Sequence, residues 1–283
     1  GLKAKVEEVA ANENATAEVK AACQEWLDTF SVGATNGAAT DKLVAALENV
    51  DCPTCKDIVK NKDFLAKKSQ WIFGGDGWAY DIGFNGVDHV LASGKDINIM
   101  VFNTEVYSNT GGQSSKATPT GAVAQFAAGG KEVKQKDLAA IAMSYGYVYV
   151  AQISMGADMN QTIKAIAEAE AYPGPSLIIA YAPCINHGIK KGMAKAQTEE
   201  KLAVQSGYWN LFRFNPAAEG KKFSLDCKPA TVDYQEFIKG EVRYTSLALK
   251  NPARAEKLFA KAEQNAKDKY AYLEKLVTLY DEK

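Results

Sequence analysis

Histidine is almost absent from this chain of 283 residues, which contains only His89 and His187. A metal site built from several histidines, or a catalytic triad that depends on histidine, is therefore not expected. Cysteine is also scarce, and its count is odd: Cys23, Cys52, Cys55, Cys184 and Cys227. Such a set argues against a disulfide framework and favours a reducing compartment, so we expect a cytoplasmic protein.

Long apolar runs and a surplus of positive charge are missing as well. No run of about 18 apolar residues occurs, so no membrane partner is expected. The formal net charge is -1, so the chain lacks the excess of positive charge that is typical of nucleic-acid-binding proteins. Hydrophobic residues still make up 47% of the chain, enough for a sizeable globular core.

Three regions are expected along the chain. Residues 1–66 are polar with a helical pattern, and predict a helical extension or insertion. Within them, Ser31 to Ala39 is expected to form a loop and Asp41 to cap a short helix. Residues 67–215 predict an α/β domain. Residues 216–283 predict a tail that ends in a long helix.

The middle region alternates strands and helices. Apolar strands are expected at 71–74, 97–102, 147–153 and 176–181, and helices at 78–92, 137–145 and 158–171. Near-continuous apolar strands joined by helices predict an α/β fold, with a parallel sheet flanked by helices on both faces. Ligands in such folds bind at the carboxyl ends of the strands. After Cys184 we expect a helix near 199–208 and then an irregular stretch to about residue 251.

Glycines flank an aspartate at the end of the first predicted strand, in Gly75-Asp76-Gly77-Trp78. The next strand runs into Asn103-Thr104-Glu105-Val106-Tyr107-Ser108-Asn109. A diphosphate requires close backbone N–H groups, a helix N-terminus and a cation. The Asp76 carboxylate, the Thr104 hydroxyl and a nearby backbone carbonyl would supply the oxygen ligands that Mg²⁺ prefers.

Other glycine-rich motifs fit this segment less well. A dinucleotide-binding loop needs a small residue where Tyr80 stands, and a Walker loop needs a Gly-Lys-Ser/Thr that residues 111–116 lack. Taken alone, Gly-Asp-Gly is explained equally well as a tight turn capped by Asp76. Its separation from Thr104 by one strand–helix–strand unit favours the thiamine diphosphate motif, Gly-Asp-Gly followed by Asn-Asn. Thr104 here replaces the second asparagine.

Three blocks of the sequence resemble the single-chain pyruvate:ferredoxin (flavodoxin) oxidoreductases. They are GGDGWAYDIG (residues 74–83), NTEVYSNTGGQSSKATP (103–119) and APCIN (182–186). The resemblance extends from about residue 67 to at least residue 207, and is loose over residues 1–66. It implies the C-terminal thiamine-diphosphate-binding segment of an enzyme that converts pyruvate and coenzyme A to acetyl-CoA and CO₂. Electrons in that family pass through 4Fe-4S clusters to ferredoxin or flavodoxin.

The resemblance also implies roles for individual residues. Mg²⁺ would be bound by the side chains of Asp76 and Thr104 and by the carbonyl of Val106. The cofactor would be lined by Gly75, Asp76, Gly77, Trp78, Thr104, Glu105, Val106, Tyr107, Ser108 and Asn109. Asn109 would be catalytic, as a hydrogen-bond donor to charge that develops on the substrate.

The resemblance makes Cys184 the fourth ligand of the 4Fe-4S cluster nearest the thiamine. From the residues alone, a buried unreactive thiol is the commoner explanation. The other three cluster cysteines are not found. Cys52-Pro-Thr-Cys55 lacks a second close pair, so packing or surface thiols are favoured there over a cluster or redox role. His187 would either tune the cluster or face solvent in a loop, and His89 would lie on the helix after the glycine turn.

The family forms its reactive carbanion with a glutamate from a separate pyrimidine-binding domain, and no such residue is assigned here. We therefore expect a segment of a longer polypeptide that is inactive alone. Its partners would be the pyrimidine-binding and cluster domains of that polypeptide, in a homo-oligomer. Two alternatives stay open: an oxidoreductase for another 2-oxoacid, such as oxobutyrate or oxoglutarate, and a non-catalytic domain that docks ferredoxin or stabilises an oligomer.

Overall fold

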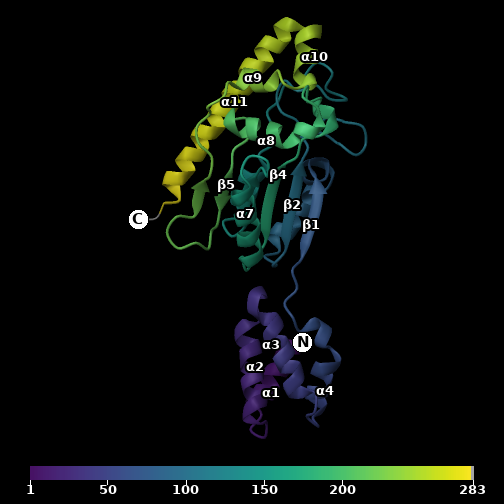
Figure 1. Ribbon diagram of the computed structural model, residues 1–283, viewed down its shortest axis with the longest axis vertical. Helices are drawn as coiled ribbons and strands as arrows, with labels where there is room; N and C mark the ends of the chain where they lie inside the picture. The colour runs from purple at the N-terminus through teal and green to yellow at the C-terminus, as the bar shows by residue number, and fades with distance from the viewer. Residues whose placement is uncertain (282–283) are drawn as a thin grey trace. The chain divides into compact units, whose positions relative to one another are not determined.

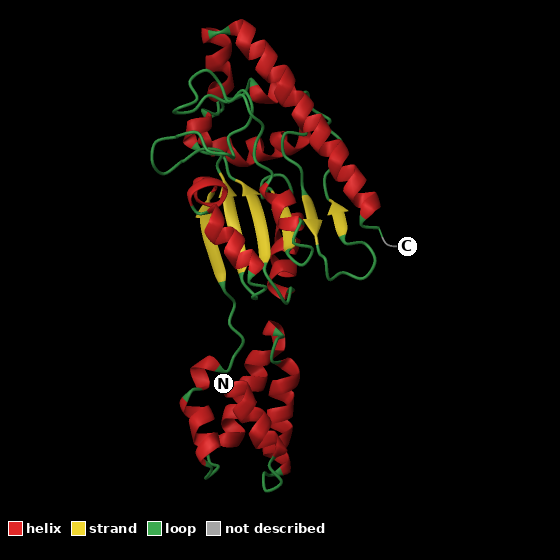
Figure 2. Ribbon diagram, turned by 180° about the vertical axis from the view of Figure 1, so that it is seen from behind, coloured by secondary structure: helices red, strands yellow, loops and turns green. Residues whose placement is uncertain are grey.

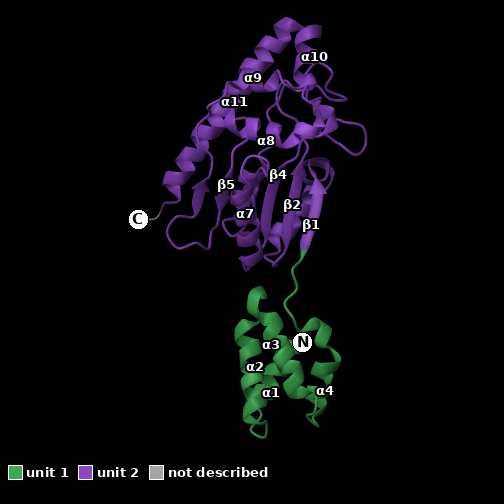
Figure 3. Cartoon of the chain, in the orientation of Figure 1, with its two compact units in different colours: residues 1–70 green, residues 71–283 purple. Residues whose placement is uncertain are grey.

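The computed structural model describes residues 1–281, and the chain divides into two compact units (Figure 3). Unit 1 is Gly1–Gln70 and unit 2 is Trp71–Lys283. The described part of the tail beyond residue 215 packs into the same hydrophobic core as the sheet of unit 2. The predicted domain boundaries at residues 66 and 215 thus stay predictions. In the structure, the compact units divide after Gln70.

Unit 1 consists of helices around a core that includes Val6, Trp26, Leu43 and Ile58. Its elements are α1 (Leu2–Ala11), α2 (Ala17–Thr29), α3 (Gly33–Leu47), α4 (Pro53–Lys60) and the 3-10 turn η1 (Lys62–Phe64). Thr16 caps α2 by accepting a hydrogen bond from the Val19 N–H.

The prediction of a loop from Ser31 to Ala39 is wrong, because α3 begins at Gly33. The prediction that Asp41 caps a helix is also wrong, because Asp41 lies inside α3. Ala39, Leu43 and Leu47 form one buried face of α3. The Trp26 Nε1–H donates to Thr40 Oγ1 at 3.1 Å across the α2–α3 contact. Tertiary packing therefore outweighs the low helix propensity of the Gly and Asn residues in this segment.

The sheet of unit 2 has six strands in the order β1-β2-β4-β3-β5-β6 (Figures 1 and 2). The strands are β1 (Trp71–Gly75), β2 (Asn98–Asn103), β3 (Tyr149–Ile153), β4 (Ser176–Tyr181), β5 (Phe212–Phe214) and β6 (Phe223–Leu225). The first four in this order are parallel, which confirms the predicted α/β fold, and β5 and β6 extend the sheet antiparallel.

Helices and short turns connect and cover these strands. They are η2 (a π-helix, Gly77–Ile82), α5 (Phe84–Ala92), α6 (Leu138–Met143), α7 (Met159–Ala171), η3 (Ile185–His187), η4 (Met193–Lys195), α8 (Ala196–Gln205), α9 (Tyr234–Ile238), α10 (Val242–Lys250) and α11 (Pro252–Leu279). The single helix expected at 78–92 is in fact η2 followed by α5. The irregular stretch expected before residue 251 contains β5, β6, α9 and α10.

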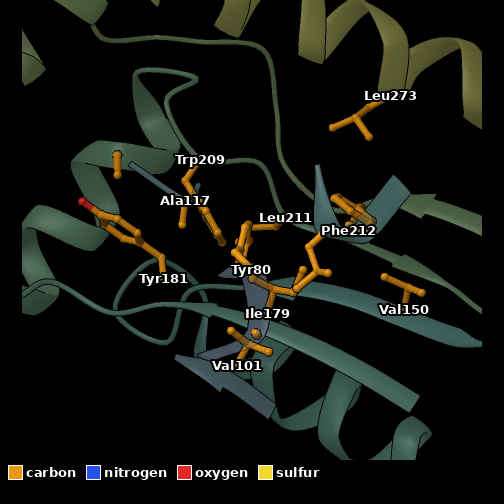
Figure 4. Close-up of a cluster of buried hydrophobic side chains, with 14 of the residues drawn as sticks. Tyr80, Val101, Ala117, Val150, Ile179, Tyr181, Trp209, Leu211, Phe212 and Leu273 are labelled. Atoms are coloured by element: carbon orange, nitrogen blue, oxygen red, sulfur yellow. The ribbon is translucent and has the colours of Figure 1, made fainter. Parts of the chain in front are cut away.

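Alternate residues of the parallel strands β2, β3 and β4 enter different cores. Ile99, Val101 and Ile179 face the large core, to which α5, α6 and α11 also contribute. Val101 and Ile179 are shown within this core in Figure 4. Met100 and Ile178 face the opposite side, where Ala165 and Ala169 of α7 pack.

Helices lie on both faces of the sheet, as expected, but the second face is covered only in part. Phe73 is 59% exposed and Phe102 is 42% exposed, and their rings stack 6.2 Å apart on the β1–β2 edge. In the described part of the chain, no helix is long and apolar enough to cross a membrane.

Candidate cofactor site at the ends of β1 and β2

Asp76 follows β1 directly and is fully buried. Its Oδ1 accepts hydrogen bonds from the Thr104 N–H at 3.1 Å and from the Thr104 hydroxyl at 2.7 Å. Its Oδ2 accepts a hydrogen bond from Ser115 Oγ at 2.5 Å. Burial raises the pKa of Asp76, although the bonds from Ser115 and Thr104 oppose that shift.

Three possible metal-ligand oxygens lie close together: Asp76 Oδ1, the Thr104 hydroxyl and the Val106 carbonyl. The Thr104 hydroxyl lies 2.7 Å from Asp76 Oδ1 and 3.0 Å from the Val106 carbonyl oxygen. Octahedral Mg²⁺ with ligands at about 2.0–2.1 Å places neighbouring ligand oxygens about 2.9 Å apart. The donor set and its spacing therefore fit a magnesium ion whose other ligands come from elsewhere.

A cleft of about 450 Å³ lies over these groups. Every residue expected to line the cofactor borders it except Glu105: Gly75, Asp76, Gly77, Trp78, Thr104, Val106, Tyr107, Ser108 and Asn109. The cleft also reaches the exposed residues Phe73, Phe102 and Ile82. A Cβ on Gly77 would lie 2.6 Å from the Tyr107 ring, whereas Gly75 faces open space.

The Glu105 side chain points away from this cleft. Its backbone has φ of 61°, an uncommon left-handed conformation for a residue other than glycine. The carboxylate is buried, pairs with Arg243 at 2.7 Å and accepts a hydrogen bond from the Tyr208 hydroxyl at 2.7 Å. Glu105 thus anchors the loop between Thr104 and Val106 through contacts on the side away from the cleft.

Arg243 and His187 complete this anchor. Arg243, on α10, also pairs with Glu241 at 2.7 Å. Burial is the largest single effect and raises the pKa of Glu241, but the charge of Arg243 and the contacts with His187 and Arg243 together outweigh it, so that pKa is lower than usual. His187 Nε2 contacts the Thr104 carbonyl oxygen at 2.8 Å, and its Nδ1 lies 3.6 Å from Glu241 Oε1. His187 is fully buried, so its solvent-facing alternative is wrong; His89 is exposed on α5.

Cys184 lies beside the same loop. Its sulfur is 2.8 Å from Ser108 Oγ and accepts hydrogen bonds from the backbone and side-chain N–H groups of Asn186 at 3.4 Å. Asn109 is exposed at the cleft. Within residues 1–281, no group of three or more His, Cys, Asp or Glu is placed to hold a metal.

Sequence reasoning missed several residues that hold the site. Ser115 lies in the Gly/Ser/Thr stretch that follows β2, but nothing in its position indicates a bond to Asp76. Arg243, Glu241 and Tyr208 lie far along the chain from Thr104, outside any recognised motif. The one available signal was Glu105 itself. A buried carboxylate needs a positively charged or hydrogen-bonding partner, so its presence in this loop indicates that such a partner exists elsewhere in the chain.

Comparisons with known proteins find relatives that are thiamine pyrophosphate enzymes. The family described as "Thiamine pyrophosphate enzyme, C-terminal TPP binding domain" matches residues 60–180. The chain is 53% identical to a pyruvate-flavodoxin oxidoreductase of Klebsiella pneumoniae over 92% of its length and 22% of the relative. It is 55% identical to a pyruvate:ferredoxin oxidoreductase of Moorella thermoacetica, over 92% of this chain and 23% of the relative.

A further relative is a mitochondrial pyruvate dehydrogenase (NADP+) of Euglena gracilis, 48% identical over 85% of this chain and 14% of the relative. The chain thus spans less than a quarter of the length of these relatives. A solved 2-oxoglutarate:ferredoxin oxidoreductase of Magnetococcus marinus aligns with a TM-score of 0.39 and 19% identity, over 54% of this chain and 46% of that chain. That structural similarity is too low to carry an argument.

Proposed function

We propose that this chain, which belongs to the pyruvate:ferredoxin (flavodoxin) oxidoreductase family, binds the diphosphate of thiamine diphosphate together with Mg²⁺. The observation that carries the proposal is the convergence of Asp76, Thr104 and the Val106 carbonyl at the cleft. All three donors are hard oxygen ligands, and the glycines of the Gly75–Gly77 turn let a diphosphate approach the backbone.

The whole reaction is proposed from the relatives. It is the oxidative decarboxylation of pyruvate with coenzyme A to acetyl-CoA and CO₂, with electrons passed through 4Fe-4S clusters to ferredoxin or flavodoxin. The names of these relatives all include pyruvate but differ in the electron acceptor. They therefore support pyruvate as the substrate more directly than they support any one acceptor. Pyrimidine-binding and cluster domains would act with this chain. The cytoplasmic location and the homo-oligomeric state stay predictions.

Each residue of the site has a specific task in this proposal. Thiamine diphosphate, when bound, supplies an electron sink for decarboxylation. Asp76, Thr104 and Val106 hold the metal that neutralises the diphosphate. Asn109, exposed at the cleft, donates a hydrogen bond to charge that develops on the substrate. Cys184, beside Ser108, supplies one thiolate ligand to a cluster.

The test is a calorimetric titration of the chain with thiamine diphosphate, with and without Mg²⁺. We expect binding that requires Mg²⁺ and that is lost in Asp76→Ala. Metal-independent binding, or equal binding by the variant, contradicts the assignment. If the wild-type chain does not bind, the same titration of a polypeptide that includes the pyrimidine-binding domain decides whether that domain supplies the missing contacts.

Cys184 is tested in a polypeptide that includes the cluster domain. We expect Cys184→Ala to bind thiamine diphosphate normally, to contain less iron and to lose ferredoxin reduction. Cys227→Ala, whose half-buried thiol lies near Leu211, is the control and should keep all three properties. Normal iron content in Cys184→Ala would show that this thiol does not bind a cluster.

A further inference from the structure

Cys52 and Cys55 form a close dithiol at the start of α4 in unit 1. Cys52 is the N-cap residue of α4, with extended backbone angles of φ −137° and ψ 130°. Its sulfur turns back over the first helical turn and accepts a hydrogen bond from the Cys55 N–H at 3.3 Å. The Cys55 side chain, one helical turn further on, lies close enough to the Cys52 sulfur for the two thiols to shift each other's pKa.

The two thiols differ in access. Cys52 is half-buried, whereas Cys55 is only 2% exposed and packs into the core of unit 1. A molecule that approaches from solvent can therefore reach Cys52 first. Cys23, the third thiol of this unit, is fully buried in the same core.

The electrostatics concentrate reactivity on Cys52. The hydrogen bond from the Cys55 thiol lowers the pKa of Cys52, and nearby Glu8 opposes that shift more weakly. Burial, followed by the contact with Cys52, raises the pKa of Cys55 to about 12, and burial raises the pKa of Cys23 to about 11. Since the thiolate is the nucleophile, Cys52 is the thiol of this pair that attacks more readily.

Two plainer roles fit less well. A metal site needs more ligands than this pair, and the described residues place no third His, Cys, Asp or Glu with it. A purely structural N-cap would favour Ser, Thr, Asp or Asn, whose oxygens are better acceptors than sulfur. Neither role explains why one thiol is accessible and its neighbour is buried.

We propose that Cys52 and Cys55 form a reversible thiol–disulfide site that exchanges with low-molecular-weight disulfides such as glutathione disulfide. The Cys52 thiolate attacks one sulfur of glutathione disulfide, whose S–S bond breaks and releases one glutathione thiolate. Cys55 then loses its proton and attacks the Cys52 sulfur of the mixed disulfide, which releases the second glutathione thiolate. Two protein thiols are oxidised, one disulfide is reduced, and two protons pass through solvent to the glutathione thiolates.

The two steps should respond differently to pH. Once Cys52 is in a mixed disulfide, its charge no longer raises the pKa of Cys55, but the burial of Cys55 persists. Resolution by Cys55 should therefore be the slower step at neutral pH. Its rate should rise about tenfold per pH unit below the pKa of Cys55, because only the thiolate attacks.

The experiment uses the 283-residue chain, reduced and then incubated with glutathione disulfide, followed by acid quenching, alkylation and peptide mass spectrometry. The wild type should form an internal Cys52–Cys55 disulfide. Cys55→Ala should stop at a glutathione adduct on Cys52. Cys52→Ser, which keeps a hydroxyl cap on α4, should form neither product. In the reduced wild type, iodoacetamide should modify Cys52 at least about tenfold faster than Cys23.

Several outcomes would overturn the proposal. A wild-type chain that stops at the Cys52 adduct shows that Cys55 does not resolve it, and a Cys23–Cys55 disulfide shows that the pairing is wrong. Equal alkylation rates for Cys52 and Cys23 refute the selective activation of Cys52. If circular dichroism shows that Cys55→Ala is unfolded, the Cys52→Ser variant and the wild-type alkylation rates decide. None of these residues belongs to the proposed thiamine diphosphate site, so the two proposals are tested independently.

Discussion

At the scale of single residues, Asp76 combines a functional position with an electrostatic cost. Because burial raises its pKa, the folded chain favours the protonated form more than the unfolded chain does. The charged carboxylate therefore reduces the free energy of unfolding as the pH rises above the usual aspartate pKa of 3.8. A bound cation would remove that cost.

Asp76→Asn should separate stability from binding. Without metal at neutral pH, we expect its free energy of unfolding to rise by ~0.5–2 kcal/mol, and the gain should vanish below pH 3.8, where the aspartate is protonated. Binding of thiamine diphosphate with Mg²⁺ should be lost. Urea unfolding and calorimetry measure the two effects. Asp63→Asn, at an exposed position, is the control and should change stability by less than ~0.5 kcal/mol. A destabilised Asp76→Asn would contradict this account.

Alanine substitutions of the two glycines beside Asp76 should also separate an effect on stability from an effect on binding. A Cβ at residue 77 meets the Tyr107 ring, so Gly77→Ala should lower the free energy of unfolding by ~1–3 kcal/mol. Gly75→Ala enters open space and should change stability by less than ~0.5 kcal/mol, yet weaken thiamine diphosphate binding by filling the diphosphate side of the cleft. Thermal unfolding and calorimetry of both variants test this, and unchanged affinity in Gly75→Ala would place the diphosphate elsewhere.

Residues of the site were predictable only where the chain order itself brings them together. Asp76 and Thr104 each directly follow a strand, and β1 and β2 pair in parallel, so the sheet brings the two residues together. The buried side chain of Glu105 could not be predicted, because its partner Arg243 comes from a distant helix and nothing local indicates its left-handed backbone.

At the scale of elements, α10 fixes the loop that carries Thr104 and Val106. Arg243 is the shared cation of two buried carboxylates, Glu105 and Glu241, and His187 joins Glu241 to the Thr104 carbonyl. A buried carboxylate that loses its cation is costly, because neither water nor a counter-charge replaces it. The geometry of the proposed metal site therefore depends on a helix that does not line the cleft.

Arg243→Met should lower the free energy of unfolding by ~3–5 kcal/mol at neutral pH. The loss should shrink as the pH approaches the ordinary glutamate pKa of 4.5, since a protonated Glu241 no longer needs a cation. Arg254→Met, which breaks an exposed pair with Glu132, should cost less than ~1 kcal/mol. Urea unfolding at several pH values measures both variants, and equal effects would show that the buried network contributes nothing special.

Elements were predictable in proportion to their length and apolar pattern. The buried strands β2 and β4 lie within one residue of their expected positions, because each is an almost continuous apolar run. Strands β5 and β6 have three residues each, too short to show a period, and their aromatic residues are placed by the core rather than by local preference. The π-turn of η2 was equally hidden, because it depends on how Trp78 packs against Gly74 and Gly83.

At the scale of the whole molecule, the chain has two units whose hydrophobic cores share no residue. The core of unit 1 surrounds Trp26, which is 1% exposed and donates a hydrogen bond to Thr40. The core of unit 2 surrounds the sheet. Separate cores predict that each unit can open locally without the other.

Trp26→Ala tests this independence. Removing a buried tryptophan costs ~3–5 kcal/mol, enough to unfold a small helical unit. Hydrogen exchange should therefore accelerate throughout α1 to α4, while the amides of β2 and β4 keep their protection and Mg²⁺-dependent thiamine diphosphate binding is unchanged. Loss of protection in β2 and β4 would instead mean that the units fold as one cooperative body. The result also bears on the dithiol, because disulfide formation at Cys52 and Cys55 could then stabilise unit 1 without altering the cofactor site.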